Sequence, residues 1–441
     1  MYSLKEWSTR IGALVLMLVT HNIGAAIDFG AVDATQVSFP AKFLLGVTAN
    51  ANNKQDAASD TEELNLIKPL GVNAFNFVLD WATIEPKEGQ FDDEQLDRIA
   101  KKCRELNVAG IKPAVYLFNS EPPAWFNAKG SFEHAKNITY FVTYCKKVFE
   151  RLRHDVHIWL TFYQPSSFAL ERYFRGNQPP YKKDMQISLE VLRNLLEAHI
   201  RVYEAIKGVR QNNGTRVGAM QGGADAQIGI SHHIYWLEPY HVINPFDQIG
   251  AAVGNGLNNK LVIEFFKTGH LKFTLPFLGK NFLWSAKIDH TNKKALHSLD
   301  FIGLLYHSHC YMKNFKTVSN PAEIKTDLDI FTIYPQGLYD AIKFVSQLKK
   351  PIHIIGNGIA DAQDKHREKF IKSHLYVVSH ALKKGYDVRS YFYRMLQAVG
   401  DEKYQFGLYK TDHEGKPTLQ KSASYFTNVI NDHREKYGCF K

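Results

Sequence analysis

The stretch Val72-Asn-Ala-Phe-Asn-Phe-Val-Leu79 is a short, mostly apolar run of the kind that forms a buried strand. A helical stretch follows from Asp92-Asp93, with apolar residues at helical spacing at Leu96, Ile99, Ala100, Cys103 and Leu106. Another strand-like run followed by a helix precedes this pair in the chain. Phe43–Thr48 is strand-like, and a helix is predicted to begin near Asp60, where Glu63 has the spacing of a capping box. Strand and helix therefore alternate from the start of the globular region.

This alternation continues along the chain. The strand-like runs are Phe43–Thr48, Val72–Leu79, Ile111–Leu117, Ile158–Phe162, Val217–Met220, Phe301–Tyr306, Ile352–Ile355 and Val388–Tyr393. The clearest helical stretches are Ile187–Ile206 and Arg367–Lys384. Strands separated by helices favour a parallel sheet, and eight such units close into a barrel. The fold class is therefore α/β, a single (β/α)8 TIM barrel over residues 41–430. An open doubly wound sheet is the alternative, but no glycine-rich phosphate loop follows the first strand.

Three further regions are expected to be less regular. Residues 227–299 are expected to hold long loops, and residues 431–441 a charged tail. At the N-terminus, Lys5 and Arg10 precede the apolar run Ile11–Val19, and small residues follow at Gly24-Ala25-Ala26. This layout predicts a signal peptide over residues 1–26, a leader over 27–42, and export to the periplasm or the cell exterior. A buried N-terminal helix is the alternative. The run is shorter than the about 20 residues that span a bilayer, and we expect no transmembrane segment in the mature chain.

The charge distribution bears on the class of binding partner, and the cysteine spacing bears on disulfide pairing. The formal net charge is +10, but the Lys and Arg residues are scattered and no nucleic-acid motif accompanies them, so no nucleic-acid partner is expected. The cysteines, Cys103, Cys145, Cys310 and Cys439, form no CxxC pair, and their pairing stays open. Cys103 lies on an apolar helix face and is predicted to be a core thiol.

Several short motifs lie along the chain in a characteristic order. They are Gly71-Val-Asn-Ala-Phe-Asn-Phe77, Thr161-Phe-Tyr-Gln-Pro165, Tyr173-Phe-Arg-Gly176, Asp300-Phe-Ile-Gly303, Tyr334-Pro-Gln-Gly-Leu338, Pro351-Ile-His-Ile-Ile-Gly-Asn-Gly358 and Phe406-Gly-Leu408. This set resembles the family 1 glycoside hydrolases, which include β-glucosidases, 6-phospho-β-glycosidases and myrosinases. The resemblance covers residues 43–428 and implies the barrel independently of the alternation.

The resemblance also locates the catalytic carboxylates of that family, and both are missing. Retaining members use a pair of carboxyl groups about 5–5.5 Å apart. Gln164 stands at the position of the acid/base, and an amide has no ionisable proton. Gly356 stands at the position of the nucleophile and has no side chain. Myrosinases also carry Gln at the first position but keep the nucleophile. We therefore expect a degenerate site that does not cleave glycosides by the retaining mechanism.

Other positions of the family's active site, which hold the sugar or, at Asn76, support the nucleophile, differ as well. They carry Asn53, Asn76, Asn119-Ser120, Tyr163, Leu305 and Arg394 in this chain, whereas Tyr306 matches the family. Positions that build the barrel match, so the fold is kept while the polar pocket is changed. The substrate-binding candidates are Asn53, Asn119, Glu121, Tyr163, Tyr306 and Arg394. Arg394 replaces a Trp and favours an acidic or phosphorylated sugar. Alternatively, Arg394 turns outward or pairs with Asp401 or Glu402.

Two functions remain open from the sequence. The first is a catalytically inactive barrel that binds a β-linked glycoside, an acidic or phosphorylated sugar, or a protein partner. The second is an active β-glycosidase with relocated groups, for which Glu121 and Asp80 near strand ends are the candidates. His307-Ser-His309-Cys310 has soft ligands at strand spacing, but no fourth zinc ligand can be named. We therefore expect neither a metal nor another cofactor.

Overall fold

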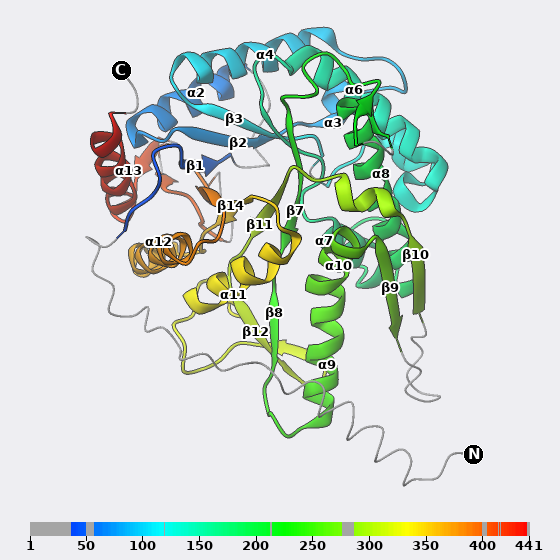
Figure 1. Cartoon of the computed structure of the whole chain (residues 1–441). Helices are drawn as coiled ribbons and strands as arrows, with labels where there is room; N and C mark the ends of the chain where they lie inside the picture. Colours follow the sequence, from blue (N-terminus) through cyan, green and yellow to red (C-terminus); the bar gives the residue numbers. More distant parts are fainter. Residues whose placement is uncertain are drawn as a thin grey trace.

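The computed structural model describes residues 37–49, 57–118, 120–211, 214–275, 286–398, 404–412, 414 and 416–438. The predicted signal peptide over residues 1–26 lies outside these residues, as do the site candidates Asn53 and Asn119. Within the described part, parallel strands form a closed barrel in the order β1-β15-β14-β11-β7-β4-β3-β2 (Figure 1). The strands are β1 (Leu44–Thr48), β2 (Ala74–Val78), β3 (Lys112–Tyr116), β4 (Ile158–Leu160), β7 (Gln227–His233), β11 (Phe301–Leu305), β14 (Ile352–Asn357) and β15 (Val388–Tyr393). The predicted (β/α)8 barrel is confirmed.

The barrel strands separate two apolar cores because successive side chains of a strand point to opposite faces. In β2, Ala74 and Val78 pack inside the barrel, whereas Phe75 and Phe77 pack in the layer between strands and helices. The same alternation places Leu305 and Ile355 in the inner core. The residues that face inward near the strand ends therefore form the floor of any site at the barrel mouth.

Helices surround the barrel (Figure 1). Their bounds are α2 (Ala57–Ile67), α3 (Trp81–Ile84), α4 (Asp93–Val108), α5 (Ala124–Ala128), α6 (Ile138–Leu152), α7 (Pro165–Ala169), α8 (Met185–Lys207), α9 (Pro245–Asn255), α10 (Leu261–Thr268), α11 (Pro335–Val345), α12 (Arg367–Lys383) and α13 (Ala423–Tyr437). Two π-helical turns, η6 (Leu170–Phe174) and η7 (Gly256–Lys260), follow α7 and α9. The predicted helices at Asp92, Ile187 and Arg367 are confirmed. In α4, Asp92 accepts a hydrogen bond from the Gln95 amide at 2.9 Å and Cys103 is buried.

The fifth strand was placed wrongly by the sequence. Val217 belongs to a short hairpin of β5 (Val209–Arg210) and β6 (Arg216–Val217), outside the barrel. The barrel strand is β7, whose Ile228 and Ile230 face the helices while Gly229 and Ser231 occupy the alternate positions. The polar residues Gln227, His232 and His233 at the two ends of this strand weaken its apolar signal. The two histidines, which would otherwise read as loop residues, complete the strand.

Residues 227–299 are not the long loops that we expected. They contain β7, the strand β8 (Trp236–Pro239), the helices α9 and α10, and the hairpin of β9 (His270–Leu275) and β10 (Ala286–Thr291). β8 pairs with β12 (His309–Lys313), which pairs with β13 (Lys316–Val318). Figure 1 shows this small sheet and α9 extending away from the barrel, in green and yellow. Together they form one wall of the cavity described below.

The structure also corrects two expectations about where helices begin and end. Asp60 does not cap α2, which begins at Ala57. Instead, Asp60 and Glu63 pair with Lys102 of α4, at 2.8 and 2.6 Å. The segment 431–441, expected to be a charged tail, is helical as far as Tyr437, and the His433 Nε2–H donates to the Pro40 carbonyl at 2.9 Å. An apolar stripe on one face of α13 packs against the barrel in spite of the charges on the other face.

Two further properties of the described residues concern membrane-spanning helices and cysteine thiols. Within them, no helix is both long and apolar enough to cross a bilayer. Cys103, Cys145 and Cys310 are buried thiols that form no disulfide. Burial raises the pKa of Cys103 to about 12, so this thiol stays protonated at neutral pH.

Candidate functional site at the barrel mouth

Gly356 lies near the C-terminal end of β14, where its neighbour Leu305 ends β11. A Cβ atom added to Gly356 would lie 2.4 Å from Leu305 Cδ2, well inside van der Waals contact. Leu305 is fully buried in the inner core of the barrel. The space into which a side chain at position 356 would begin to grow is therefore filled by leucine.

Gln164 follows β4 at the start of α7 and has a left-handed backbone, with φ 49° and ψ 62°. The backbone N–H of Gln164 donates a hydrogen bond to Ser231 Oγ of β7 at 3.2 Å. The side chain is half-buried and lines a cavity at the side of the barrel mouth. Gln164 thus reaches the mouth, but its amide can only donate and accept hydrogen bonds.

Arg394, the residue directly after β15, turns into the mouth rather than outward. Its Nη1 donates to Tyr163 Oη at 3.0 Å and to His307 Nε2 at 3.3 Å. The guanidinium also lies 5.2 Å from the ring centroid of Phe406. Among the residues that the structure describes, no carboxylate pairs with Arg394. The structure therefore brings Tyr163 and Arg394 together. It adds His307, which the sequence offered only as a metal ligand, and Phe406, which the sequence placed only in a family motif.

The histidines beside Arg394 are electrically neutral. His307 Nδ1–H donates to the Gly358 carbonyl at 3.1 Å, which leaves Nε2 as the acceptor for Arg394. Burial, reinforced by the charge of Arg394, holds the pKa of His307 well below its usual value. The ring of His233 lies 5.3 Å from that of His307, and burial lowers the pKa of His233 to about 3. Neutral imidazoles leave Arg394 as the cation of this cluster.

Tyr306 does not face the mouth, contrary to our expectation. It is fully buried in the layer between barrel and helices, and its hydroxyl donates to the Tyr334 carbonyl at 2.7 Å. The side chains of β11 alternate without a break, so Leu304 and Tyr306 face the helices and Leu305 and His307 face the barrel interior. Asn76 faces inward, but its amide donates to the Ala114 carbonyl at 3.0 Å and ties β2 to β3.

The two carboxylates considered for relocated chemistry occupy structural positions. Glu121 is 77% exposed and accepts a hydrogen bond from Arg172 at 2.6 Å. Asp80 caps α3, where its carboxylate accepts the Ala82 amide at 3.0 Å. Neither residue lines the cavity at the mouth. The structure does not join them into a carboxylate pair inside a pocket.

His307 and His309 do not share a site. His309 Nδ1 binds Glu238 at 2.9 Å and its Nε2 binds Glu323 at 2.8 Å, while its ring stacks on Tyr334 at 3.6 Å. Cys310 Sγ accepts from the Tyr235 hydroxyl at 2.6 Å. Within the described residues, no cluster of three or more His, Cys, Asp or Glu side chains is arranged to hold a metal ion.

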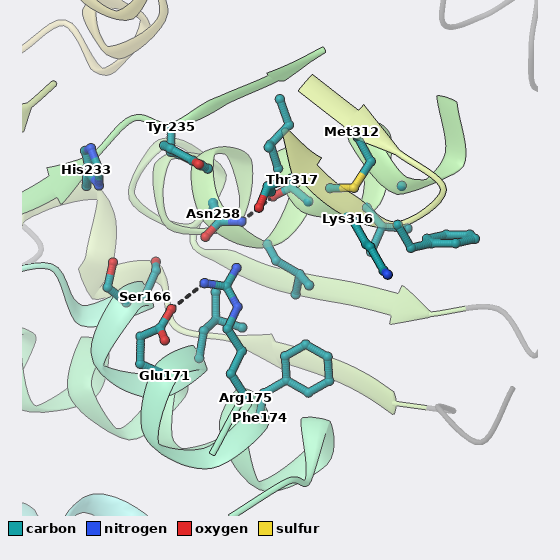
Figure 2. Close-up of a pocket in the computed structure, with 18 of the residues that line it drawn as sticks. Ser166, Glu171, Phe174, Arg175, His233, Tyr235, Asn258, Met312, Lys316 and Thr317 are labelled. Carbon is teal, nitrogen blue, oxygen red and sulfur yellow. Dashed lines mark hydrogen bonds and ion pairs between the residues drawn. The ribbon is translucent and has the colours of Figure 1, made fainter. Parts of the chain in front are cut away.

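A cavity of about 920 Å³ opens beside the mouth (Figure 2). Its walls come from α7 and η6, from the end of β7, from α9 and η7, and from the β12–β13 hairpin. Glu171 is the single carboxylate among the residues that line it, and this carboxylate pairs with Arg175. Gln164 and His233 mark its inner end; Leu305, Gly356 and Arg394 are not part of its lining. The cavity is therefore displaced to one side of the barrel axis.

Sequence reasoning missed the residues that shape this cavity. His232 and His233 lie at the end of the strand that was placed too early, and a period-two pattern in Gln227-Ile-Gly-Ile-Ser231 would have identified it. Phe406 belongs to a motif that was used only for the resemblance. It lies 12 residues after Arg394, and no sequence pattern predicted the contact between them.

Comparison with known proteins agrees with this architecture. The sequence profile described as "Glycosyl hydrolase family 1" matches residues 45–435. A 6-phospho-beta-galactosidase from Leptotrichia buccalis is 25% identical over 426 residues, covering 85% of this chain and 87% of the relative. A 6-phospho-beta-galactosidase from Staphylococcus haemolyticus is also 25% identical over 427 residues, with the same coverage of each chain.

Solved structures share the fold. A beta-glycosidase from Pyrococcus horikoshii superimposes with a TM-score of 0.75 at 24% identity, over 91% of this chain and 98% of that chain. A beta-glucosidase from Thermotoga maritima in complex with deoxynojirimycin gives a TM-score of 0.74 at 21% identity, over 90% of this chain and 99% of that chain. Because the family profile spans most of the sequence, the chain belongs to glycosyl hydrolase family 1.

Proposed function

We propose that this chain is an exported, non-catalytic family 1 barrel that works by binding rather than by cleaving glycosides. The observation that carries the proposal is the contact between position 356 and Leu305. A nucleophile needs a side chain at 356, and even its Cβ would lie 2.4 Å from Leu305 Cδ2. A side chain at position 356 would therefore require the Leu305 Cδ2 methyl group, which now lies in that space, to move. Gln164 at the second catalytic position supports the same conclusion, since it cannot exchange a proton.

The positions of Glu121 and Asp80 disfavour relocated catalysis. A carboxyl group that serves as a general acid at neutral pH needs a raised pKa, which burial supplies. Glu121 is exposed and held by Arg172, and Asp80 holds the N-terminus of α3. Each carboxylate already has a structural role away from the cavity.

A second candidate role is binding of an acidic or phosphorylated sugar at Arg394, which one specific observation favours. The guanidinium contacts only neutral groups of the described residues, namely Tyr163, His307 and the ring of Phe406. A half-buried cation that has no carboxylate partner among the described residues, which do not include Asp401 and Glu402, favours an anionic ligand. Relatives named 6-phospho-beta-galactosidases make a sugar 6-phosphate the natural probe.

Hydrolysis is the decisive measurement for the proposed function. The purified mature chain is assayed with 4-nitrophenyl β-glucoside, β-galactoside and their 6-phosphates, beside the variant Glu121→Gln. We expect no turnover above a buffer blank from either protein. Turnover by the wild type that Glu121→Gln abolishes would overturn the proposal in favour of relocated chemistry. Turnover that survives Glu121→Gln would also overturn it.

Export is tested separately from chemistry. The full chain is expressed in a secretion-competent host, and the intact mass of the exported product is measured. We expect a product that begins at residue 27, after removal of residues 1–26. An unprocessed product that stays inside the cell would contradict the exported location and leave the proposal of a non-catalytic barrel standing.

A further inference from the structure

The end of the small sheet that lies away from the barrel carries large apolar side chains in solvent (Figure 1). Val242 and Ile243, in the turn between β8 and α9, are 71% and 93% exposed, and Phe246 in the first turn of α9 is 57% exposed. Phe315, in the turn between β12 and β13, is 39% exposed, and its ring centroid lies 6.2 Å from that of Phe246. These four residues are called the apolar tip below. Single exposed apolar residues are ordinary, but several gathered at one end of a projection indicate a contact surface.

Hydrogen bonds hold the two turns of the apolar tip together. Asp247 is fully buried, and its carboxylate accepts from the backbone N–H and the Nδ1–H of His241, both at 3.0 Å. The same carboxylate accepts the Asn314 backbone N–H at 2.7 Å, which joins the β8–α9 turn to the β12–β13 turn. The Asn244 side chain caps α9 by accepting the Phe246 N–H at 3.0 Å. The exposed apolar side chains are therefore presented by an internally bonded scaffold.

The exposed charges beside the apolar tip are positive. Apart from histidines, the charged residues of segments 236–247 and 309–318 are Glu238, Asp247, Lys313 and Lys316. Asp247 is buried, and Glu238 binds His309 at 2.9 Å. Lys313 and Lys316 are exposed, and Lys313 Nζ lies 4.6 Å from the ring centroid of Tyr240. The surface complementary to this arrangement is apolar where it meets the tip and negatively charged where it meets the lysines.

The size and shape of the apolar tip favour a lipid surface over a second copy of the chain. Its four residues together expose roughly 500 Å², on a scale where one aromatic side chain buries about 150–250 Å². A standard interface between two proteins buries about 800 Å² on each partner. The tip also lies at the end of a projection, which limits how much of it a second copy could cover (Figure 1). A bilayer can surround such a projection, with acyl chains against the apolar side chains and phosphates at the lysines.

We propose that the apolar tip inserts into the surface of an anionic lipid bilayer, with Lys313 and Lys316 at the headgroup phosphates. Apolar side chains gain free energy by leaving water, and each lysine near a negative surface adds an attraction that salt weakens. The formal net charge of +10 adds long-range attraction to such a surface. The proposal goes beyond the proposed function and does not depend on it, because the tip residues contribute nothing to positions 164 and 356.

Co-sedimentation with vesicles tests the proposal. The purified mature chain, without the predicted signal peptide, is mixed with vesicles of phosphatidylcholine alone and with vesicles of phosphatidylcholine and phosphatidylglycerol in equal amounts. We expect saturable binding to the mixed vesicles, about tenfold or more tighter than to phosphatidylcholine. Absence of binding to the mixed vesicles would overturn the proposal, and so would equal binding to the two compositions.

An apolar double variant separates insertion from the general attraction of a basic protein. Val242→Ser/Ile243→Ser is expected to weaken binding to the mixed vesicles about tenfold or more, because both side chains then stay hydrated. The matched control is Val108→Ser, at a position 90% exposed on α4, and it is expected to bind like the wild type. Binding that is unchanged in the double variant would need charge alone and would refute insertion of the tip.

A charge variant tests the lysines. Lys313→Gln/Lys316→Gln is expected to weaken binding to the mixed vesicles about tenfold. Lys101→Gln/Lys147→Gln removes the same charge from α4 and α6, on the opposite side of the molecule (Figure 1), and is expected to weaken it less than about twofold. Equal losses in the two variants would contradict the assigned headgroup contact. A dimer in sedimentation velocity that Val242→Ser/Ile243→Ser abolishes would give the tip to a second copy and would also overturn the proposal.

Discussion

The contact between Gly356 and Leu305 can be tested by adding one methyl group. In Gly356→Ala the new Cβ would lie 2.4 Å from Leu305 Cδ2, about 1 Å short of the ordinary contact that begins at 3.4 Å. Overpacking a closed core of this kind costs about 1–3 kcal/mol of unfolding free energy. Leu305→Ala removes a fully buried side chain and is expected to cost about 2–5 kcal/mol. The double variant relieves the clash, so its cost should fall about 1–3 kcal/mol below the sum of the single costs.

The assay is urea denaturation followed by tryptophan fluorescence for all four members of the cycle. Gly256→Ala is the matched control, because it has a helical backbone and its nearest foreign atom is at 3.4 Å. Relief of backbone freedom should leave that control neutral or stabilise it by up to about 1 kcal/mol. The reasoning is refuted if Gly356→Ala behaves like the control, or if the cycle is additive within about 0.5 kcal/mol. Either result would mean that Leu305 does not occupy the space of the nucleophile.

Further expectations concern charged groups. Burial opposes the charge of His309, but its hydrogen bonds with Glu238 and Glu323 raise its pKa above 6.5. Its stabilising contribution is therefore complete below pH 6.5 and is lost as the pH rises through the folded-state pKa. Scanning calorimetry at pH 6 and pH 9 should show His309→Phe losing less stability over this interval than the wild type. Arg367→Leu should cost about 3–5 kcal/mol in urea denaturation, because Arg367 is fully buried and ion-paired, whereas the exposed control Arg389→Leu should cost under about 1 kcal/mol. In a thermal-shift assay, galactose 6-phosphate should raise the melting temperature and galactose should not. Arg394→Gln should abolish that shift; an equal response of the variant would remove Arg394 from any anion site.

Local chemistry was readable from the sequence alone. The alternation of apolar runs and amphipathic helices predicted the barrel, because strand and helix periods differ and each unit must bury one face. The prediction that Gln164 and Gly356 stand at the catalytic positions needed only the order of the motifs. The long helices were found for the same reason, since α8 and α12 carry apolar stripes over several turns.

The tertiary structure decided which way the side chains of a strand face and which distant segments come into contact. In a strand, a shift of one residue moves a side chain to the opposite face. In β11 the alternation places Tyr306 toward the helices and His307 toward the mouth. The approach of Leu305 to Gly356 joins two strands that are 51 residues apart by number, and no local pattern encodes it.

The cavity is the clearest product of the tertiary structure. Its walls come from segments as distant as Ser166, Val253 and Met312, and the α9 region looked irregular in the sequence. What the sequence determined is the family 1 barrel, together with the prediction that Gln164 and Gly356 stand at its catalytic positions. What only the folded chain decided is that the described residues leave an open cavity beside the barrel mouth, with Gln164 and His233 in its lining. The physical reason is that residue chemistry is local, whereas space is left only by the packing of segments far apart in the chain.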